Sequence, residues 1–573
     1  MKTTNKIIAC AVLLLLTVIA QAQPEPQSEF GTETIMIGAN RPIERARRIN
    51  EQPKIADTSI AVPAMSYNNL PGRADVRYAP DPIDPAKLKI QPTLEKLYKF
   101  YAKAGVGMYT TPLAEIYFND GYNKKGTYGI HAKHFSSQGS DKQKSFNGFS
   151  DNEIDGYGKF YWNKYEIGGN AEYKRNVVYY YGSNPDSLDI DKDKIRQRFN
   201  YFSGKAYFGT YYPDSDKINH REDLRYYYFD DAFGAVEHNV LATSALTTRK
   251  NKEVFGGNIL FDYNSFSPTA HDVNCLNCWE LGLTDSAQNT ALLQLNPYVM
   301  SNYKNLHVKV GLSIWADIDK ETGKFRFYPD IEARYSLFND VFVPYIGITG
   351  KTVRNSYRSL TNENPFVMSV ADLKNTNQKF RIYGGFRGTI SSTISFNAKA
   401  DYLVAKNMPL FVTDTSYSSE NRFAVIFEDV DVVSVSGQLM WQKAEKLKLL
   451  LRGEFFSYSP LEERKAWGMP GFTITSGFIY DMYDKIIVRA DLFVTGKRYG
   501  RSLTPVDGVT EDHGVYPVEL KPFADINLGF EYRYTKRLSG FINFNNVVSK
   551  KYQYWYNYPV QGINILGGVT YSF

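Results

Sequence analysis

Apolar and polar side chains alternate through most of the chain after about residue 100. In the clearest stretch, Leu447, Leu449 and Leu451 share one face, while Lys448 and Arg452 lie on the other. Successive side chains of a strand point to opposite faces, so this period of two predicts β-strands with one apolar and one charged face. The same division recurs in residues 306–314, 486–495 and 525–533.

Counting such segments predicts about 22 strands, the number that plugged outer-membrane transporters have. We therefore expect an all-β fold, a transmembrane antiparallel β-barrel of about 22 strands. The predicted strands cover residues 100–109, 113–120, 126–135, 153–163, 165–181, 197–213, 217–230, 236–248, 251–265, 287–302, 304–317, 323–337, 340–355, 377–388, 391–413, 421–443, 445–459, 470–482, 484–498, 518–533, 537–549 and 561–573.

The connections between these strands fall into two kinds. If the C-terminus is periplasmic, the short turns near residues 163, 250, 339, 483 and 535 all lie on the periplasmic side. The long loops 136–152, 266–286, 356–376 and 499–517 then all lie outside the cell. Short turns inside and long loops outside are the expected polarity of a Gram-negative outer-membrane barrel.

The direction in which the charged face of each strand points distinguishes a membrane barrel from a soluble β-protein. A soluble sandwich exposes its charged face to water, whereas a barrel in lipid turns that face toward its lumen. Mean hydropathy is only −0.39, yet 15% of residues are aromatic, which fits polar interiors and aromatic girdles. A secreted Tyr-rich sandwich or propeller is the alternative. The candidate lumen-lining residues are Lys448, Arg452, Glu454, Arg489, Asp491 and Arg533.

The N-terminal part of the chain differs in composition. Residues 1–22 combine Lys2, an apolar run and a small-residue cleavage site, which indicates a secretory signal. Residues 23–98 contain ten of the 25 prolines and predict an extended periplasmic or luminal arm, followed by a barrel over residues 99–573. A basic cluster in the arm is either a solvated surface or a docking peptide for another outer-membrane or periplasmic subunit. Its members are Arg41, Arg45, Arg47 and Arg48.

Two cysteines remain once the predicted signal is removed. Cys275 and Cys278 form a C-x-x-C sequence in a polar loop of an exported chain, so a local disulfide is expected. With His271 they could instead begin a zinc site, and a C-x-x-C can also carry redox chemistry.

The C-terminal strand has the pattern that closes an outer-membrane barrel. Apolar Ile565, Val569, Tyr571 and Phe573 alternate with small or polar residues up to the free terminal carboxylate. We expect Tyr571 and Phe573 to be read by the barrel-assembly machinery during insertion into the lipid. The last 35 or so residues, with FINFNNVVSKKY at 541–552 and GVTYSF at 568–573, resemble the closing signature of TonB-dependent receptors.

This resemblance implies a receptor or transport barrel, with one departure. TonB-dependent receptors fold a globular plug inside the barrel, and residues 23–98 are too short and too rich in proline to form one. The organisation resembles plugless, TonB-receptor-like barrels of Bacteroidota-type outer membranes. Residues 32–39 (TETIMIGA) resemble a TonB box, which binds by strand addition. The missing plug argues against energised uptake but leaves contact with TonB open.

Catalytic signals are weak. The histidines are scattered, and His131 and His134 cannot share a metal on one strand, because residues three apart face opposite ways. Rim constellations such as Asp230, Asp231 and His238, or Asp512 and His513, are ordinary loop residues. We expect no enzyme, cofactor, metal or nucleic-acid partner. Two functions remain: a transport barrel, or a non-transporting subunit of an outer-membrane assembly or secretion complex.

Overall fold

The computed structural model describes most of the chain from residue 98 onward. The predicted signal, the arm with its arginine cluster, the TonB-box-like segment and the cysteine pair lie outside the described residues. The described residues are 98–120, 123, 125–139, 147–182, 193–210, 216–269, 286–319, 323–369, 372–413, 421–444, 446–502, 505–506, 508–511 and 515–573.

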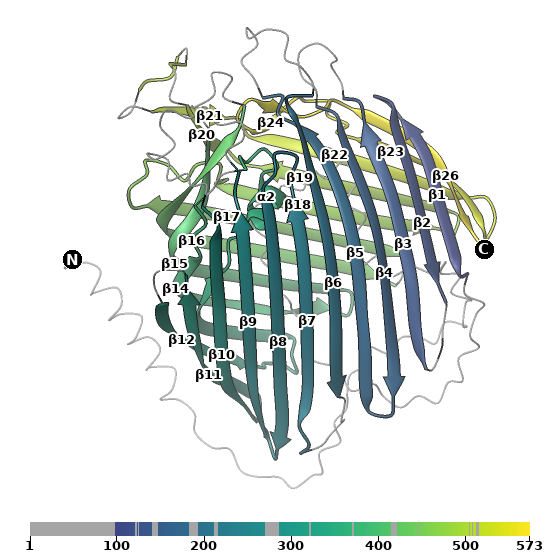
Figure 1. Ribbon diagram of the computed structural model, residues 1–573. Helices are drawn as coiled ribbons and strands as arrows, with labels where there is room; N and C mark the ends of the chain where they lie inside the picture. The colour runs from purple at the N-terminus through teal and green to yellow at the C-terminus, as the bar shows by residue number, and fades with distance from the viewer. Residues whose placement is uncertain are drawn as a thin grey trace. The chain divides into compact units, whose positions relative to one another are not determined.

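Twenty-two strands form one closed antiparallel barrel, which confirms the predicted fold class (Figure 1). Each strand pairs with its neighbour, and β1 closes the ring on β26 from Tyr101 opposite Ser572 to Gly107 opposite Leu566. The strands of the ring are β1 Phe100–Gly107, β2 Thr111–Asn119, β3 Gly126–Ser137, β4 Phe149–Trp162, β5 Tyr165–Tyr179, β6 Arg196–Thr210, β7 Asn219–Asp230, β8 Val236–Lys250, β9 Glu253–Ser267, β10 Gln288–Tyr303, β11 Leu306–Ile318, β12 Gly323–Tyr335, β13 Phe342–Val353, β14 Thr376–Ser391, β15 Ile394–Thr413, β16 Phe423–Lys443, β17 Leu447–Pro460, β18 Phe472–Met482, β19 Ile486–Thr495, β22 Phe523–Arg533, β23 Leu538–Asn545 and β26 Asn564–Ser572.

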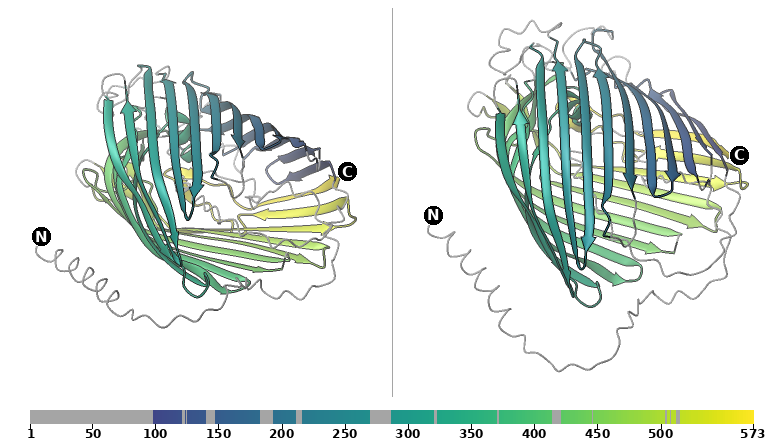
Figure 2. Two further views of the ribbon diagram at one scale, coloured as in Figure 1. Left: turned by 90° about the horizontal axis from the view of Figure 1, so that it is seen from below. Right: turned by 60° about the horizontal axis from the view of Figure 1, so that its bottom comes forward.

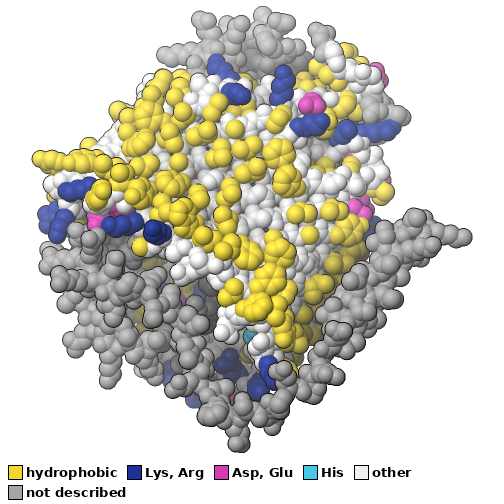
Figure 3. Space-filling model, turned by 180° about the vertical axis from the view of Figure 1, so that it is seen from behind, with side chains coloured by type: hydrophobic (Ala, Val, Ile, Leu, Met, Phe, Trp, Pro, Cys, Tyr) yellow, Lys and Arg dark blue, Asp and Glu magenta, His cyan; other side chains and the backbone are white. Residues whose placement is uncertain are grey.

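Side-chain exposure follows the predicted alternation. Val435 and Phe455 face each other across β16 and β17 and are 52% and 56% exposed. Large apolar side chains are exposed in the same way around the ring and form a broad apolar surface (Figure 3). Such a surface on the outside of a barrel matches a lipid-facing belt. Among the described residues, no helix has the length and apolar character needed to cross a membrane.

The two ends of the barrel differ in their connections, as predicted. The connections after β3, β9, β13 and β19 lie at one end, which we call the long-loop end. Those after β4, β8, β12, β18 and β22 lie at the other, the short-turn end, together with Phe573. At the β18–β19 turn, Tyr483 and Asp484 both have φ of 56°, as a two-residue turn of type I′ requires.

Some predicted strand limits are wrong. β4 begins at Phe149, four residues earlier than predicted, whereas β19, β22 and β23 are shorter than predicted. The chain leaves the wall there to form two small hairpins at the long-loop end, β20 (Arg498–Ser502) with β21 (Tyr516–Leu520), and β24 (Gln553–Trp555) with β25 (Tyr558–Pro559). The loop predicted at 356–376 contains a helix, α2 (Tyr357–Glu363).

Candidate functional site

Two opposite walls of the barrel touch at the long-loop end. Tyr180 follows β5 and Asn421 precedes β16, and these strands stand eleven apart, half of the ring of 22. The Asn421 side-chain amide donates a hydrogen bond of 2.9 Å to the Tyr180 carbonyl oxygen. The Arg422 guanidinium lies 4.9 Å from the centre of the Tyr180 ring. The space between the walls is therefore bridged by packed side chains.

Helix α2 lies in this bridge. Ser356 caps it by accepting from the Ser359 amide, and the Ser359 hydroxyl accepts from the Ser356 amide, which makes a capping box. The amides of Tyr357 and Arg358 donate to the two carboxylate oxygens of Glu237 on β8, at 3.0 and 2.9 Å. Glu237 is fully buried. A carboxylate at a helix N-terminus pairs with orphan amides and the helix dipole, so α2 is anchored to the wall.

A second buried carboxylate fixes the same helix. Asp231 accepts from the Tyr357 hydroxyl at 2.7 Å, from the Gln197 side chain at 3.2 Å and from the Ser369 hydroxyl. It also accepts from the amide of Ala235 at 2.9 Å. A buried carboxylate that loses such donors keeps its full desolvation cost, so these contacts hold α2 in place.

The segment after α2 joins the opposite wall through backbone bonds. Val367 forms an isolated parallel bridge with Phe423, the first residue of β16. The Met368 amide donates to the Phe423 carbonyl at 2.9 Å, and the Phe423 amide donates to the Phe366 carbonyl at 3.0 Å. The Tyr180 hydroxyl donates to the Val367 carbonyl at 3.1 Å. One loop therefore bonds to β8 and to β16.

Aromatic side chains from the β24–β25 hairpin complete the packing. The rings of Tyr558 and Phe366 stack with their centres 3.6 Å apart, and the rings of Trp555 and Phe411 meet edge-on with their centres 5.1 Å apart. The Tyr181 hydroxyl donates to the Pro559 carbonyl at 3.0 Å. We call this cluster the cap. Its buried residues are Tyr180, Tyr181, Ile195, Phe199, Tyr201, Tyr227, Phe229, Ala235, Phe266, Tyr357, Leu360, Phe366, Val367, Phe411, Phe423, Val425, Trp555 and Tyr558.

The cap has the construction of a folded core rather than of a surface loop. Figure 1 shows α2 among the strands at the long-loop end, and Figure 2 shows the ring of strands from two further directions. Replacing a single buried aromatic side chain by Ala typically costs about 3–5 kcal/mol, so moving the cap apart is expensive. The sequence pattern points to a site at none of these buried residues, and of the residues that contact them it singles out Asp231, as a rim residue with Asp230 and His238. The one available signal was the serine pair of the capping box in residues 356–359.

Below the cap, charges of alternating sign cross the wall. Lys103, Glu115, Lys133, Glu153 and Lys174 stand directly opposite one another on β1 to β5. The Lys174 ammonium lies 3.1 Å from the Glu153 carboxylate. Cross-strand pairs of opposite charge stabilise a sheet, so this ladder stabilises the register of five strands.

His131 lies beside this ladder. Its Nδ1 is 2.7 Å from Asp155 and its Nε2 is 3.2 Å from Glu115. In the described part of the chain, His131, Asp155 and Glu153 are the group with ligand atoms close enough to hold a metal ion. His134 instead contacts Asn152, at 2.7 Å from its Nδ1.

Four of the six candidate lumen-lining residues also take part in ion pairs. Arg452 bonds Glu454 at 2.7 Å, and Arg489 bonds Glu531 at 3.2 Å. Arg533 bonds Asp481 at 3.2 Å. Asp491 is buried, and Lys448 is exposed near the short-turn end.

The terminal aromatic residues and the rim residues are also described. The rings of Phe573 and Phe100 stack with their centres 4.9 Å apart; the Phe573 amide donates to the Phe100 carbonyl, and the Phe100 amide donates to a terminal oxygen of Phe573. The ring centres of Tyr571 and Phe573 lie 5.6 Å apart. The three rim residues have different partners: Asp231 accepts from Tyr357 of the cap, Asp230 accepts from the Asn200 side chain, and the His238 Nδ1 lies 2.9 Å from the Tyr226 hydroxyl. Asp512 and His513 lie outside the described residues.

Comparison with known proteins gives structural likeness without sequence likeness. No family model matches the chain, and neither does any curated protein. The FrpB iron transporter from Neisseria meningitidis (F3-3 variant) is similar with a TM-score of 0.62 and 9% identity, over 84% of this chain and 82% of that chain. The siderophore receptor PirA from Acinetobacter baumannii is similar with a TM-score of 0.59 and 11% identity, over 83% and 80%.

A ferric enterobactin receptor (PfeA) mutant from Pseudomonas aeruginosa is similar with a TM-score of 0.58 and 11% identity, over 83% of this chain and 80% of that chain. At such identities the likeness shows the fold. The chain therefore has a TonB-dependent receptor-like barrel, as its closing residues indicated.

Proposed function

We propose that this protein is a receptor-type barrel of a Gram-negative outer membrane, with its short-turn end in the periplasm and its lumen closed to free diffusion by the cap. The fold, the exposed apolar belt and the unequal ends support the membrane and the orientation. The paired charges on the strands, including Arg452 and Arg489, would line the lumen. No catalytic step is part of this function.

The proposed closure of the lumen rests on the contact between opposite walls of the barrel. Passage along the axis requires that Asn421 separate from Tyr180 and that α2 leave Glu237. Both changes expose a buried aromatic core, and the second leaves the buried Glu237 carboxylate without two amide donors, at a cost of about 1–3 kcal/mol per unpaired group. A barrel of this strand number without such a barrier would admit large solutes.

Transport through movement of the cap is the activity that we favour. The similar structures are named as an iron transporter, a siderophore receptor and a ferric enterobactin receptor, which supports uptake of a ligand by this chain. In that case the ligand would bind at the long-loop end and the cap would move as one unit, because its aromatic contacts are shared among several loops.

Single-channel recording tests the closure. The full chain in planar bilayers should show no stable open channel, whereas replacement of residues 356–369 by a flexible linker should produce one. Glu237→Gln should give intermittent openings, and Glu253→Gln, an exposed carboxylate at the short-turn end, should not. Stable conductance of the full chain at the level of the linker variant would overturn the proposal.

A non-transporting subunit is the second candidate, and the core-like build of the cap favours it. A cap that never opens leaves the barrel to act through its surfaces, with the arm at residues 23–98 docking a partner through Arg41 to Arg48. Purification from the native membrane in mild detergent separates the candidates. A stoichiometric complex that is lost when the arm is deleted supports a subunit, and an isolated barrel supports transport.

A further inference from the structure

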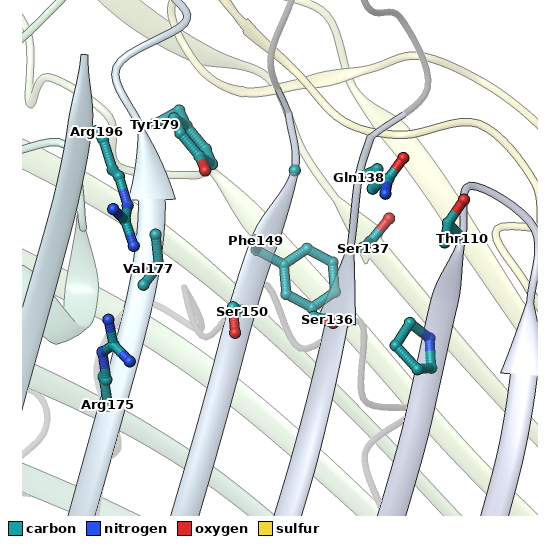
Figure 4. Close-up of a pocket in the computed structure, with 12 residues that line it drawn as sticks. Thr110, Ser136, Ser137, Gln138, Phe149, Ser150, Arg175, Val177, Tyr179 and Arg196 are labelled. Carbon is teal, nitrogen blue, oxygen red and sulfur yellow. The ribbon is translucent and has the colours of Figure 1, made fainter. Parts of the chain in front are cut away.

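A cavity of about 320 Å³ lies at the long-loop end of β2 to β6 (Figure 4). Two arginines line it, Arg175 on β5 and Arg196 on β6. Figure 4 shows their guanidinium groups pointing toward each other beside Val177. The hydroxyls of Thr110, Ser136 and Ser150 line other parts of the cavity.

Most of this lining belongs to the outer face of the barrel. On β5, Tyr173 is 40% exposed, and Arg175 and Val177 follow it on the same face by the period of two. On β6, Phe202 is 47% exposed and shares its face with Arg196. The opposite face of β5 carries Lys174, which belongs to the charge ladder, and Asn176.

The register sets the height of the cavity above the apolar belt. Tyr173 pairs with Phe202, and the next outward pair toward the long-loop end is Arg175 with Asn200. Two residues of a strand span about 7 Å, so Arg175 stands that far beyond an aromatic row. Aromatic girdles mark the interface of a membrane barrel, and the cavity therefore lies at the level of lipid headgroups.

The charge of the cavity is positive. Among the described residues, neither Arg175 nor Arg196 has an ion-pair partner. Arg198 lies 3.8 Å from Asp230, which also accepts from the Asn200 side chain, so the nearby carboxylate is already occupied. Guanidinium forks and hydroxyls bind phosphate oxygens by charge-assisted hydrogen bonds.

We propose that this cavity binds the phosphate-bearing headgroup of a membrane lipid. The phosphate would lie between Arg175 and Arg196, and the acyl chains would continue over Tyr173 and Phe202 along the belt. The continuity of the cavity with the belt favours a lipid over a soluble anion. Such a site would serve a transporter and a subunit alike.

Native mass spectrometry of the full chain in detergent tests this site with two lipids of the same acyl chains. Dioleoyl phosphatidic acid should be retained in preference to dioleoylglycerol, which lacks the phosphate. The double variant R175Q/R196Q should bind phosphatidic acid at least about tenfold more weakly, because two charge-assisted contacts are lost. The control variant K250Q/K443Q removes two exposed lysines at the short-turn end and should bind normally.

Three results would overturn the assignment. Equal retention of the two lipids would show that the phosphate is not recognised. Equal loss in the arginine and lysine variants would show that general surface charge holds the lipid. Displacement of phosphatidic acid by millimolar inorganic phosphate would identify a site for soluble anions. Heat-modifiable migration on gels confirms that both variants fold as barrels.

Discussion

The side-chain amide of Asn421 donates a 2.9 Å hydrogen bond to the carbonyl of Tyr180, across 241 residues of sequence. These residues flank strands on opposite sides of the ring. The bond therefore joins two walls that would otherwise be separated by the width of the lumen. The bond holds the two walls together at the long-loop end, where side chains pack as they do in a folded core.

Removing this donor should loosen the cap. Asn421→Asp keeps the shape of the side chain but replaces the amide donor by an acceptor, and a lost hydrogen bond typically costs about 0.5–1.5 kcal/mol. Amide exchange in peptides covering residues 356–369 should accelerate several-fold. Asn163→Asp, in an exposed turn at the other end, is the control and should leave these peptides unchanged. Unchanged exchange in Asn421→Asp would show that the bridge does not stabilise the cap.

The two faces of a strand should respond differently to charge. Leu451 is exposed on the apolar belt, so Leu451→Arg near the midplane should lower stability by about 2–4 kcal/mol. Arg452→Leu changes the opposite face and should be tolerated. Folding yields in lipid vesicles over a urea series measure both. A larger loss for Arg452→Leu would reverse the assignment of faces.

The stability of the barrel should depend on the order of the charges in the ladder. Glu153→Lys places three ammonium groups in a row with Lys133 and Lys174, because these residues stand directly opposite one another. We expect a loss of about 1 kcal/mol, since like charges opposite one another destabilise a sheet. Adding Lys174→Glu restores opposite charges at positions 153 and 174, while Lys133 still faces a like charge, so the double variant should recover part of the loss. A double-mutant cycle without coupling would contradict an energetic role for the ladder.

The barrel was predictable from the sequence, and the cap was not. In β17 the alternation of leucines with Lys448 and Arg452 is local, so it marks the strand without knowledge of its neighbours. The cap depends on contacts between distant residues such as Tyr180 and Asn421, which leave no period in the sequence. Helix α2 has seven residues, too few for an amphipathic pattern. Its position is fixed by Glu237, a residue that the sequence places in an ordinary strand.

The cap should loosen as pH rises. Burial raises the pKa of Glu363, at the end of α2 and outside the spanning strands, from 4.5 to about 7. The folded cap therefore holds a proton that the opened cap releases, so its stability is highest below pH 4.5 and falls as pH rises through about 7. Glu363→Gln should remove this dependence. The protection of residues 356–369 relative to the intrinsic exchange rate, compared at pH 5 and pH 8, measures it, with exposed Glu462→Gln as the control. Stronger protection at pH 8 than at pH 5 would contradict the direction.

Amide exchange of the full chain in lipid nanodiscs tests most directly whether the cap is a fixed core. Peptides that contain the amides of Tyr357 and Arg358 should be protected as strongly as those of β8, because both amides donate to buried Glu237. Peptides over the exposed turn at residues 338–341 provide the fast reference. Protection of residues 356–369 at the level of β8 is the predicted result. Exchange as fast as that of the turn would show that the long-loop end is open, and would contradict the closed barrel proposed for this protein.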